Sequence, residues 1–311
     1  MQKFIDLRSG GEFVPHSSLV LCLGTFDGVH RGHMALIEET LRQKSLLCDE
    51  YPDILGGAWC FSQPPADFLF ERSAPHITTL DRKLELFAEA GLDVAVVGDF
   101  PTVRRISHVD FINSLLRDEC RCVKAVCGFN FRFGNGALGT PDDLSALPRG
   151  CVTLPRVTFG DVTVSSSEIR RRIADGRIEE ANEMLGRPFS FDLPVIHGKS
   201  LGRHLGAPTI NQQIPKESLI PAHGVYASRA TVGGETYVSI TNIGTNPTVS
   251  DGDAIHCETH LLNFKGDLYG ERVTTELLKF LRPERRFGSK TELSEAIASD
   301  IASAKKYFDL V

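Results

Sequence analysis

Ten residues near the start of the chain, Gly24–His33, combine three glycines, an aspartate and two histidines, residue types suited to holding a phosphate. The segment lies between an expected strand, Ser18–Leu23, and an expected helix that begins at His33. Glycine lets the backbone approach a ligand closely, and a helix start offers free N–H groups to an anion. His30 and His33 are three residues apart, so both imidazoles can point the same way. A glycine-rich turn with surface histidines would explain either histidine alone but not the combination.

A second polar segment that could bind a charged ligand is Pro208-Thr209-Ile210-Asn211. In an extended segment Thr209 and Asn211 point to one face, and their oxygens suit a hard cation such as Mg²⁺. Taken by itself, the tetrapeptide is more typical of an Asx-type turn than of a metal site. The other motifs in the second half of the chain decide between a metal site and a simple turn.

These two segments must be positioned by different kinds of scaffold. The first half of the chain alternates strand-like and helix-like segments, which favours a parallel sheet with helices on both faces. Ligands bind such sheets at the carboxyl ends of the strands, where Gly24–His33 is expected to lie. Strands are expected at Ser18–Leu23, Gly57–Phe61, Val94–Val97 and Val123–Cys127, and helices at His33–Arg42, Asp81–Ala90 and His108–Arg117.

The pattern changes near Ser165-Ser166-Ser167-Glu168, which is typical of a helix start because serines can cap it and a glutamate lies in its first turn. Arg171 and Arg172 are expected to form a solvated face of that helix. Two short helices follow, and Pro188 prevents further continuation. We therefore expect two domains, 1–186 and 187–311.

The second domain is expected to be a compact β-barrel with one helix after it. Short alternating runs, such as Val225–Val232 and Thr236–Ile240, are separated by turn residues. Apolar residues recur at helical spacing from Ser289 to Phe308. The chain therefore combines two unlike domains.

Composition limits the classes of partner. The chain has 311 residues and a formal net charge of −6, which provides no basic field for nucleic acid. Its eight cysteines show no paired metal-ligand spacing, and free thiols suit a reducing cytoplasm. No apolar signal segment or long uncharged apolar run is visible, so we expect a cytoplasmic protein without a membrane anchor, as a monomer or weak homo-oligomer.

With these segments in view, the chain resembles the bacterial bifunctional riboflavin kinase/FAD synthetases. Gly24–His33 looks like the His-x-Gly-His signature of the adenylyltransferase superfamily in its version from these enzymes. The other matching stretches of the first domain are Gly128–Gly134 (Gly-x-Asn-Phe-x-Phe-Gly), Val164–Arg170 (Ser-Ser-Thr-x-Ile-Arg, with Ser167 for threonine) and the junction Leu185–Phe189. Those of the second are Pro208–Asn211 (Pro-Thr-Ala-Asn, with Ile210 for alanine), Asn242–Thr248, Glu258–His260, Phe264, Asp267–Gly270 and Arg282–Glu284.

The resemblance implies a fold and two activities. The fold is an α/β nucleotidyltransferase-type parallel sheet (Rossmann-like) followed by a β-barrel riboflavin kinase domain with a terminal helix. The enzyme would phosphorylate riboflavin with ATP to FMN, then adenylylate FMN to FAD with release of pyrophosphate. It would be a transferase with Mg²⁺ as metal, ATP as co-substrate, and riboflavin, FMN and FAD as substrate, intermediate and product.

The resemblance also implies roles for individual residues. Glu258 would take the proton of the riboflavin 5′-hydroxyl, and Thr209 and Asn211 would hold Mg²⁺. His30 and His33 would stabilise the triphosphate during adenylyl transfer. The expected ATP- and phosphate-binding residues are Gly24, Phe26, Asp27, Gly28, Asn130, Ser166, Ser167, Arg170, Gly202, Arg203 and Gly206.

Two positions depart from the family pattern. Pro64 replaces a histidine that helps to line the ATP site in relatives, and Leu201 stands where many relatives have arginine. Proline has no side-chain donor, so one phosphate contact of the first domain is absent or supplied elsewhere. A riboflavin kinase with a weakened or inactive adenylyltransferase domain is therefore the nearest alternative. A flavin-binding protein without catalysis is a third possibility, against which the retained histidines and Glu258 argue.

Two further motifs lead to other classes and are rejected. Gly198-Lys199-Ser200 resembles the end of a P-loop, but position 193 is leucine where that motif needs glycine. Gly134–Gly139 fits the Gly-x-Gly-x-x-Gly fingerprint of nicotinamide oxidoreductases. In that fold the helix begins inside the fingerprint, whereas Thr140-Pro141-Asp142 predicts a helix that begins after it.

Overall fold

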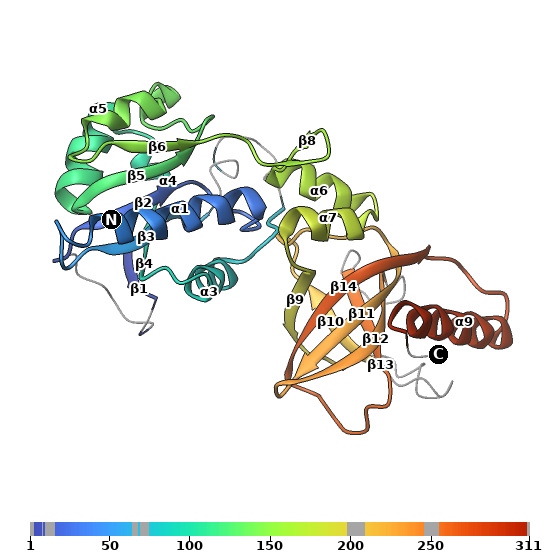
Figure 1. The fold of residues 1–311 in the computed structure, drawn as a ribbon. Coiled ribbons are helices and arrows are strands. Elements are labelled where there is room, and N and C mark those ends of the chain that lie inside the picture. Colours follow the sequence, from blue (N-terminus) through green and yellow to red (C-terminus); the bar gives the residue numbers. More distant parts are fainter. Residues whose placement is uncertain are drawn as a thin grey trace. The chain divides into compact units, whose positions relative to one another are not determined.

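The computed structural model describes residues 3–7, 9, 16–63, 68, 75–197, 209–245 and 255–309. The chain divides into two compact units, Met1–Ser166 and Ser167–Val311. The division lies before the expected boundary at 186/187, which stays a prediction. Both units are drawn in Figure 1, coloured along the sequence.

The first unit is built on a six-stranded sheet of order β1-β4-β3-β2-β5-β6. Neighbouring strands run parallel except at the edge, where β1 pairs antiparallel with β4. The strands are β1 Lys3–Asp6, β2 Leu19–Leu23, β3 Leu55–Phe61, β4 Val94–Gly98, β5 Cys122–Gly128 and β6 Cys151–Leu154. The expected parallel sheet is confirmed, and β2 is buried along its whole length because both faces of the sheet are covered.

Two apolar cores lie on opposite faces of this sheet. One core contains Leu36, Ile37 and Phe87, from the helices α1 and α3. The other contains Phe111 and Leu116, from the helical segment before β5. The helices are α1 Arg31–Leu47, α3 Leu80–Glu89, α4 Phe100–Val103 and α5 His108–Asp110, which continues as the π-helix Phe111–Glu119.

Short elements connect β5 to the second unit. Asn135–Ala137 and Pro141–Ala146 are 3-10 helices, and β7 Thr158–Phe159 pairs with β8 Val162–Thr163 as a small hairpin. Thr140 caps the second 3-10 helix in a capping box with Asp143. This helix begins after the glycine fingerprint, as the sequence predicted.

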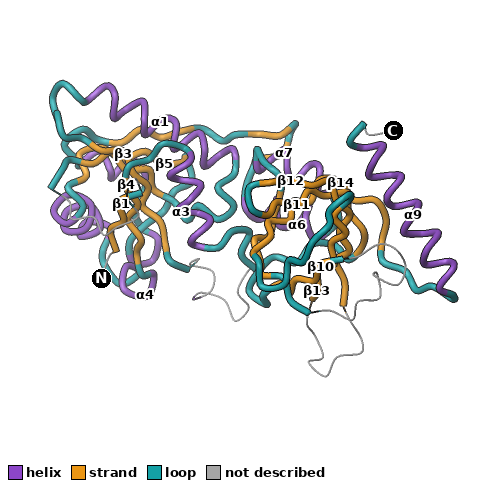
Figure 2. The backbone as a smooth tube through the Cα atoms, turned by 90° about the horizontal axis from the view of Figure 1, so that it is seen from below, coloured by secondary structure: helices purple, strands orange, loops and turns teal. Residues whose placement is uncertain are grey.

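The second unit contains a six-stranded antiparallel sheet of order β10-β13-β12-β11-β14-β9. Its two edges meet through a bridge between Ile196 and Asn211, where the Ile196 N–H donates to the Asn211 carbonyl at 2.8 Å. The sheet is therefore a nearly closed barrel, as Figure 2 shows in a second view. The strands are β9 Phe189–Pro194, β10 Ile210–Ile214, β11 Gly224–Val232, β12 Glu235–Thr245, β13 Ile255–Leu261 and β14 Arg272–Pro283.

Among its described residues, the barrel unit has the helices α6 Ser166–Ala174, whose first residue ends the first unit, α7 Ile178–Leu185 and α9 Lys290–Tyr307. The terminal helix α9 packs Ile297, Ile301 and Ala304 against Ala227 of β11 and Ile240 of β12. A bidentate ion pair joins Arg282 at the end of β14 to the buried Asp300 of α9, at 2.8 and 2.9 Å. The expected barrel with a terminal helix is confirmed.

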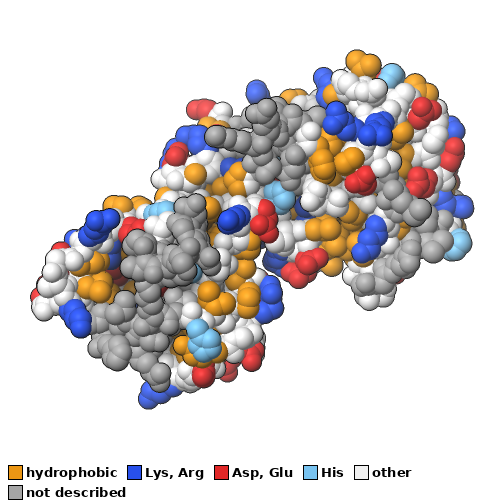
Figure 3. Space-filling model, turned by 180° about the vertical axis from the view of Figure 1, so that it is seen from behind, with side chains coloured by type: hydrophobic (Ala, Val, Ile, Leu, Met, Phe, Trp, Pro, Cys, Tyr) orange, Lys and Arg blue, Asp and Glu red, His pale blue; other side chains and the backbone are white. Residues whose placement is uncertain are grey.

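Charged side chains of both signs are interspersed on the face drawn in Figure 3. This distribution agrees with the modest net charge of −6. Among the described residues, none of the helices combines the length and apolar character that crossing a bilayer requires.

Candidate functional site

The loop from Gly24 to the start of α1 has a constrained backbone. Phe26 and Val29 have positive φ angles of 53° and 37°, which non-glycine residues rarely adopt. Both side chains are fully buried, and the Phe26 ring packs edge-on against Phe87 with centroids 5.2 Å apart. The apolar contacts hold the backbone in this strained conformation, so the loop has a fixed shape at the carboxyl end of β2.

The two histidines of the loop lie face to face. His30 is the N-cap of α1, and its Nδ1 accepts from the His33 N–H at 3.3 Å. The rings stack with centroids 3.6 Å apart and an interplanar angle of 14°. A Cβ at Gly32 would lie 3.1 Å from His30 Cε1, so glycine gives the imidazole its room. The structure thus brings both predicted histidines together at a helix N-terminus, where an anion is favoured.

Asp27 tethers the loop rather than facing outward. Its carboxylate accepts from the N–H groups of Ile77 and Thr78 at 3.1 and 3.2 Å, and the residue is 3% exposed. The Thr78 hydroxyl in turn accepts from the Gly28 N–H at 3.1 Å. On the other side, the Ser166 hydroxyl donates to the Asp27 carbonyl at 2.8 Å. Ser166, far along the chain, therefore lies at the same loop, as its predicted role requires.

A lysine that the sequence analysis missed also contacts this loop. Lys83 of α3 is 4% exposed, and its Nζ donates to the Thr25 carbonyl at 3.0 Å. Its position on the apolar side of α3, with Leu86 and Phe87, was the available signal. A lysine in an otherwise buried stripe is rare enough to indicate a specific partner.

Asn130 lies in the turn that follows β5 and is exposed.

Two cysteines on neighbouring strands form a close pair. Cys127 of β5 lies beside Cys151 of β6, with their Sγ atoms 3.5 Å apart. The hydrogen bond between them lowers the pKa of Cys151 and raises that of Cys127. No local sequence pattern indicates this pair, because the two residues are remote in the chain.

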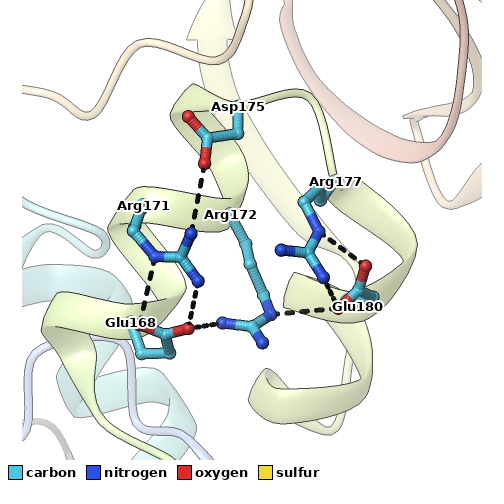
Figure 4. Close-up of polar contacts among 6 residues, drawn as sticks. All are labelled: Glu168, Arg171, Arg172, Asp175, Arg177 and Glu180. Carbon is cyan, nitrogen blue, oxygen red and sulfur yellow. Dashed lines mark hydrogen bonds and ion pairs between the residues drawn. The ribbon is translucent and has the colours of Figure 1, made fainter.

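The prediction for Arg172 was wrong, whereas that for Arg171 is confirmed. The Arg171 side chain is 52% exposed, but Arg172 is 3% exposed. Arg172 lies between Glu168 of α6 and Glu180 of α7, bonded to the first through Nη1 and to the second through Nε at 3.2 Å (Figure 4). A buried guanidinium needs such partners, so this side chain holds the two helices together.

Glu168 is the centre of the charged network drawn in Figure 4. Hydrogen bonds from Arg171 and Arg172 lower its pKa from 4.5 to about 2. Beside it on α6, Ser167 is exposed and Arg170 is half-buried. The network fixes the helix that carries both residues.

The second candidate site lies on the barrel. Asn211 of β10 and Glu258 of β13 are directly opposite each other in an antiparallel pair. Opposed residues in such a pair share one face of the sheet with Cβ atoms about 5 Å apart. Asn211 is 9% exposed, Thr209 directly precedes β10, and Thr209 and Glu258 are half-buried. The structure thus brings Asn211 and Glu258 together, while Gly202, Arg203 and Gly206, with Leu201 and Pro64, lie outside the described residues.

The oxygen donors at this place fit a hard divalent cation. The side chains of Thr209, Asn211 and Glu258 offer a hydroxyl, an amide and a carboxylate oxygen. Such oxygen ligands are those that Mg²⁺ prefers, usually together with substrate phosphates.

Comparisons with known proteins match both halves of the chain. Residues 14–168 match the family model for FAD synthetase, and residues 185–308 match that for riboflavin kinase. A bifunctional riboflavin kinase/FMN adenylyltransferase from Escherichia coli K12 is 35% identical over 310 residues, which are 95% of each chain. One from Pseudomonas fluorescens is 33% identical over 298 residues, 93% of each chain. The crystal structure of a macrolide-efflux protein from Streptococcus pneumoniae has a TM-score of 0.84 at 25% identity, covering 96% of this chain and 97% of that one.

Proposed function

Because the chain belongs to the bifunctional riboflavin kinase/FMN adenylyltransferase family, we propose that it makes FMN from riboflavin and ATP and then FAD from FMN and a second ATP. The observation that carries the proposal is the pairing of Asn211 with Glu258 on the barrel. It joins a metal-ligand motif to a carboxylate base, as a hydroxyl kinase requires. The stacked histidines of the first unit support the second activity.

In the kinase step Glu258 removes the proton of the riboflavin 5′-hydroxyl. The hydroxyl oxygen then attacks the γ-phosphorus of ATP, and ADP leaves. Thr209 and Asn211 would hold Mg²⁺, which offsets charge on the phosphates when it is bound. Gly202, Arg203 and Gly206 belong to the same proposal as phosphate-binding residues. The oxygen donors of β10 and the half-buried carboxylate of Glu258 support these roles.

In the adenylyl step an oxygen of the FMN phosphate attacks the α-phosphorus of ATP, and pyrophosphate leaves. Catalysis here consists mainly of positioning and charge stabilisation. His30 and His33 stabilise the triphosphate at the N-terminus of α1, with the glycines of the loop providing backbone access. Asn130, Ser166, Ser167 and Arg170 bind the nucleotide or its outer phosphates. The fixed shape of the loop and the contact of Ser166 with Asp27 support this assignment.

The two steps are tested by chromatography of the flavins, starting once from riboflavin and once from FMN, with ATP and Mg²⁺ in both. We expect FMN and then FAD from riboflavin, and FAD from FMN. Glu258→Gln should abolish FMN formation, because it removes the base, and leave conversion of supplied FMN largely intact. Loss of both steps in a folded Glu258→Gln protein would contradict the two-site proposal.

The alternative is a riboflavin kinase whose first unit has little or no activity. It is favoured by one observation, the proline at position 64 where relatives have a histidine. FMN formation from riboflavin without any FAD from supplied FMN would support it.

We place the enzyme in the cytoplasm, with small molecules as its substrates and no nucleic acid or membrane partner. This placement agrees with eight free cysteines among the described residues.

A further inference from the structure

Glu258 has a second amide neighbour, on the side of the strand away from Asn211. In the barrel β13 lies between β10 and β12, and Glu258 is directly opposite Asn211 on the first and Asn242 on the second. All three side chains therefore share one face of the sheet, in a row across three strands. Asn242 belongs to a motif of the resembled family but has no role in the function proposed above.

This face is not the interior of the barrel. The adjacent residues Thr241 and Thr259 point to the opposite face, where their hydroxyls bond each other at 2.9 Å in a fully buried cluster with Ser228. Successive residues of a strand point to opposite faces, so Asn242 and Glu258 lie on the outer one. Both are half-buried.

Along β12 the outer face changes character at Asn242. Two residues earlier, Ile240 packs against Ala304 of α9. Two residues later, a Cβ on Gly244 would collide with the Glu284 carboxylate, so the strand there is covered by a charged group. Asn242 lies between these two regions, directly opposite Glu258 on β13 and the buried Val225 on β11. Of these two neighbours, only Glu258 can accept a hydrogen bond from its side chain.

We propose that Asn242 is a positioning residue for the kinase step, whose carboxamide N–H donates a hydrogen bond to the Glu258 carboxylate. This proposal rests on the function proposed for Glu258. A base must be ionised and must aim one oxygen at the substrate hydroxyl. A neutral amide can fix the carboxylate and leave its negative charge in place. A lysine at the same position would neutralise that charge. Asn242 thus acts through Glu258 on the phosphorylation of riboflavin alone.

The first test is Asn242→Leu, which keeps the size of the side chain and removes its donor. We expect kcat for FMN formation to fall about 10- to 100-fold, the cost of a misaimed catalytic group. KM for riboflavin should change less than about threefold, because Asn242 does not bind it. FAD formation from supplied FMN, measured in the same preparation, should stay unchanged. Asn242→Ser keeps a donor and should recover most of the lost kcat.

Thr236→Val is the matched control on the same strand, at its exposed end, where the Thr236 hydroxyl bonds that of Thr231 at 2.9 Å. It should leave both steps at wild-type rates. If Asn242→Leu does not fold, as its melting curve would show, Asn242→Ala takes its place. A fall in melting temperature with an unchanged kcat below the transition would assign Asn242 a structural role and overturn the proposal.

A double-mutant cycle with Glu258→Asp shows whether Asn242 acts through Glu258. If it does, adding Asn242→Leu to Glu258→Asp should cost much less than it costs the wild type. Equal costs in both backgrounds would overturn the proposal. The two levels of inference fail separately: a wild-type enzyme that makes no FMN refutes the proposed function, whereas an active enzyme insensitive to Asn242→Leu refutes only the positioning role.

Discussion

Asn211 and Glu258 lie directly opposite each other on β10 and β13, although a long stretch of chain separates them. The antiparallel register thus places the end of a Pro-Thr-Ile-Asn segment beside a carboxylate that would be unremarkable by itself. The following predictions test this pair and the other features that position the two sites.

Asn211→Ala should lower the affinity of the kinase site for Mg²⁺. The change removes one oxygen ligand, so we expect the Mg²⁺ concentration for half-maximal rate to rise about tenfold. A titration of Mg²⁺ at saturating riboflavin and ATP measures it. An unchanged titration curve would show that Asn211 does not bind the metal. FAD formation from FMN is the internal control and should keep its own dependence.

His33→Ala should slow adenylyl transfer while leaving the kinase intact. Removal of one group that stabilises developing charge typically costs about 10²- to 10³-fold in rate. The measurement is initial FAD formation from FMN and ATP. His16→Ala, an exposed histidine outside the loop, serves as the control. Equal loss of FMN formation from riboflavin would indicate a general folding defect and count against the assigned role.

Arg172→Met should destabilise the second unit. The substitution keeps most of the side-chain volume but leaves Glu168 and Glu180 without their shared buried partner. We expect a loss of about 2 kcal/mol, less than for a fully buried pair because the Glu180 side chain is 35% exposed. Urea unfolding measures it. Arg171→Met, at an exposed position of the same helix, should change stability by less than about 0.5 kcal/mol.

The Glu168 ion pairs should make stability fall in acid. Since hydrogen bonds lower the pKa of Glu168 from 4.5 to about 2, the folded state favours its ionised form. This contribution is fully present above pH 4.5 and is lost as the pH falls towards 2. The difference in unfolding free energy between wild type and Glu168→Gln, measured across this range, should shrink as the pH decreases. A difference independent of pH would refute the ion-pair origin.

Alkylation should separate the cysteines by exposure and pKa. Cys48 is exposed, and Cys151 is half-buried with a pKa lowered by its hydrogen bond to Cys127. Burial raises the pKa of Cys22, Cys60 and Cys257. Iodoacetamide near neutral pH, followed by peptide mass spectrometry, should label Cys48 and Cys151 first. Prior labelling of Cys22 or Cys257 would contradict the buried arrangement.

The sequence predicted the elements whose patterns are local. The apolar run of β2, the glycine loop after it and the helical spacing of α9 each correspond to an observed element. β10 and β14 were not predicted, because Gln212 and Thr275 are polar yet fully buried and disrupt the alternation. Their side chains bond each other at 3.0 Å inside the barrel, a partnership that only the fold creates.

The family motifs name the candidate site residues, but they do not indicate which distant chain segments meet. Arg172 looked like a solvated residue because its second partner, Glu180, lies on the next helix. Lys83 was missed for a similar reason, since its partner, the Thr25 carbonyl, lies in the loop after β2. Spacing along a chain carries no direct information about such partners.

The helices α6 and α7 have a practical consequence for attempts to divide this protein. Two of the proposed phosphate-binding residues, Ser167 and Arg170, lie on α6, just after the unit boundary. On α7, the Asn182 side chain accepts from the Phe189 N–H and donates to the Leu277 carbonyl of the barrel. A fragment cut at residue 187 would strip the barrel of that amide and uncover apolar surface at Met184 and Leu185, which now are buried. The helical segment that carries two of the proposed phosphate-binding residues is thus followed directly by a helix that is bonded to the barrel. A barrel fragment that is to fold by itself should therefore begin before α7, so that Asn182, Met184 and Leu185 stay with the strands they contact.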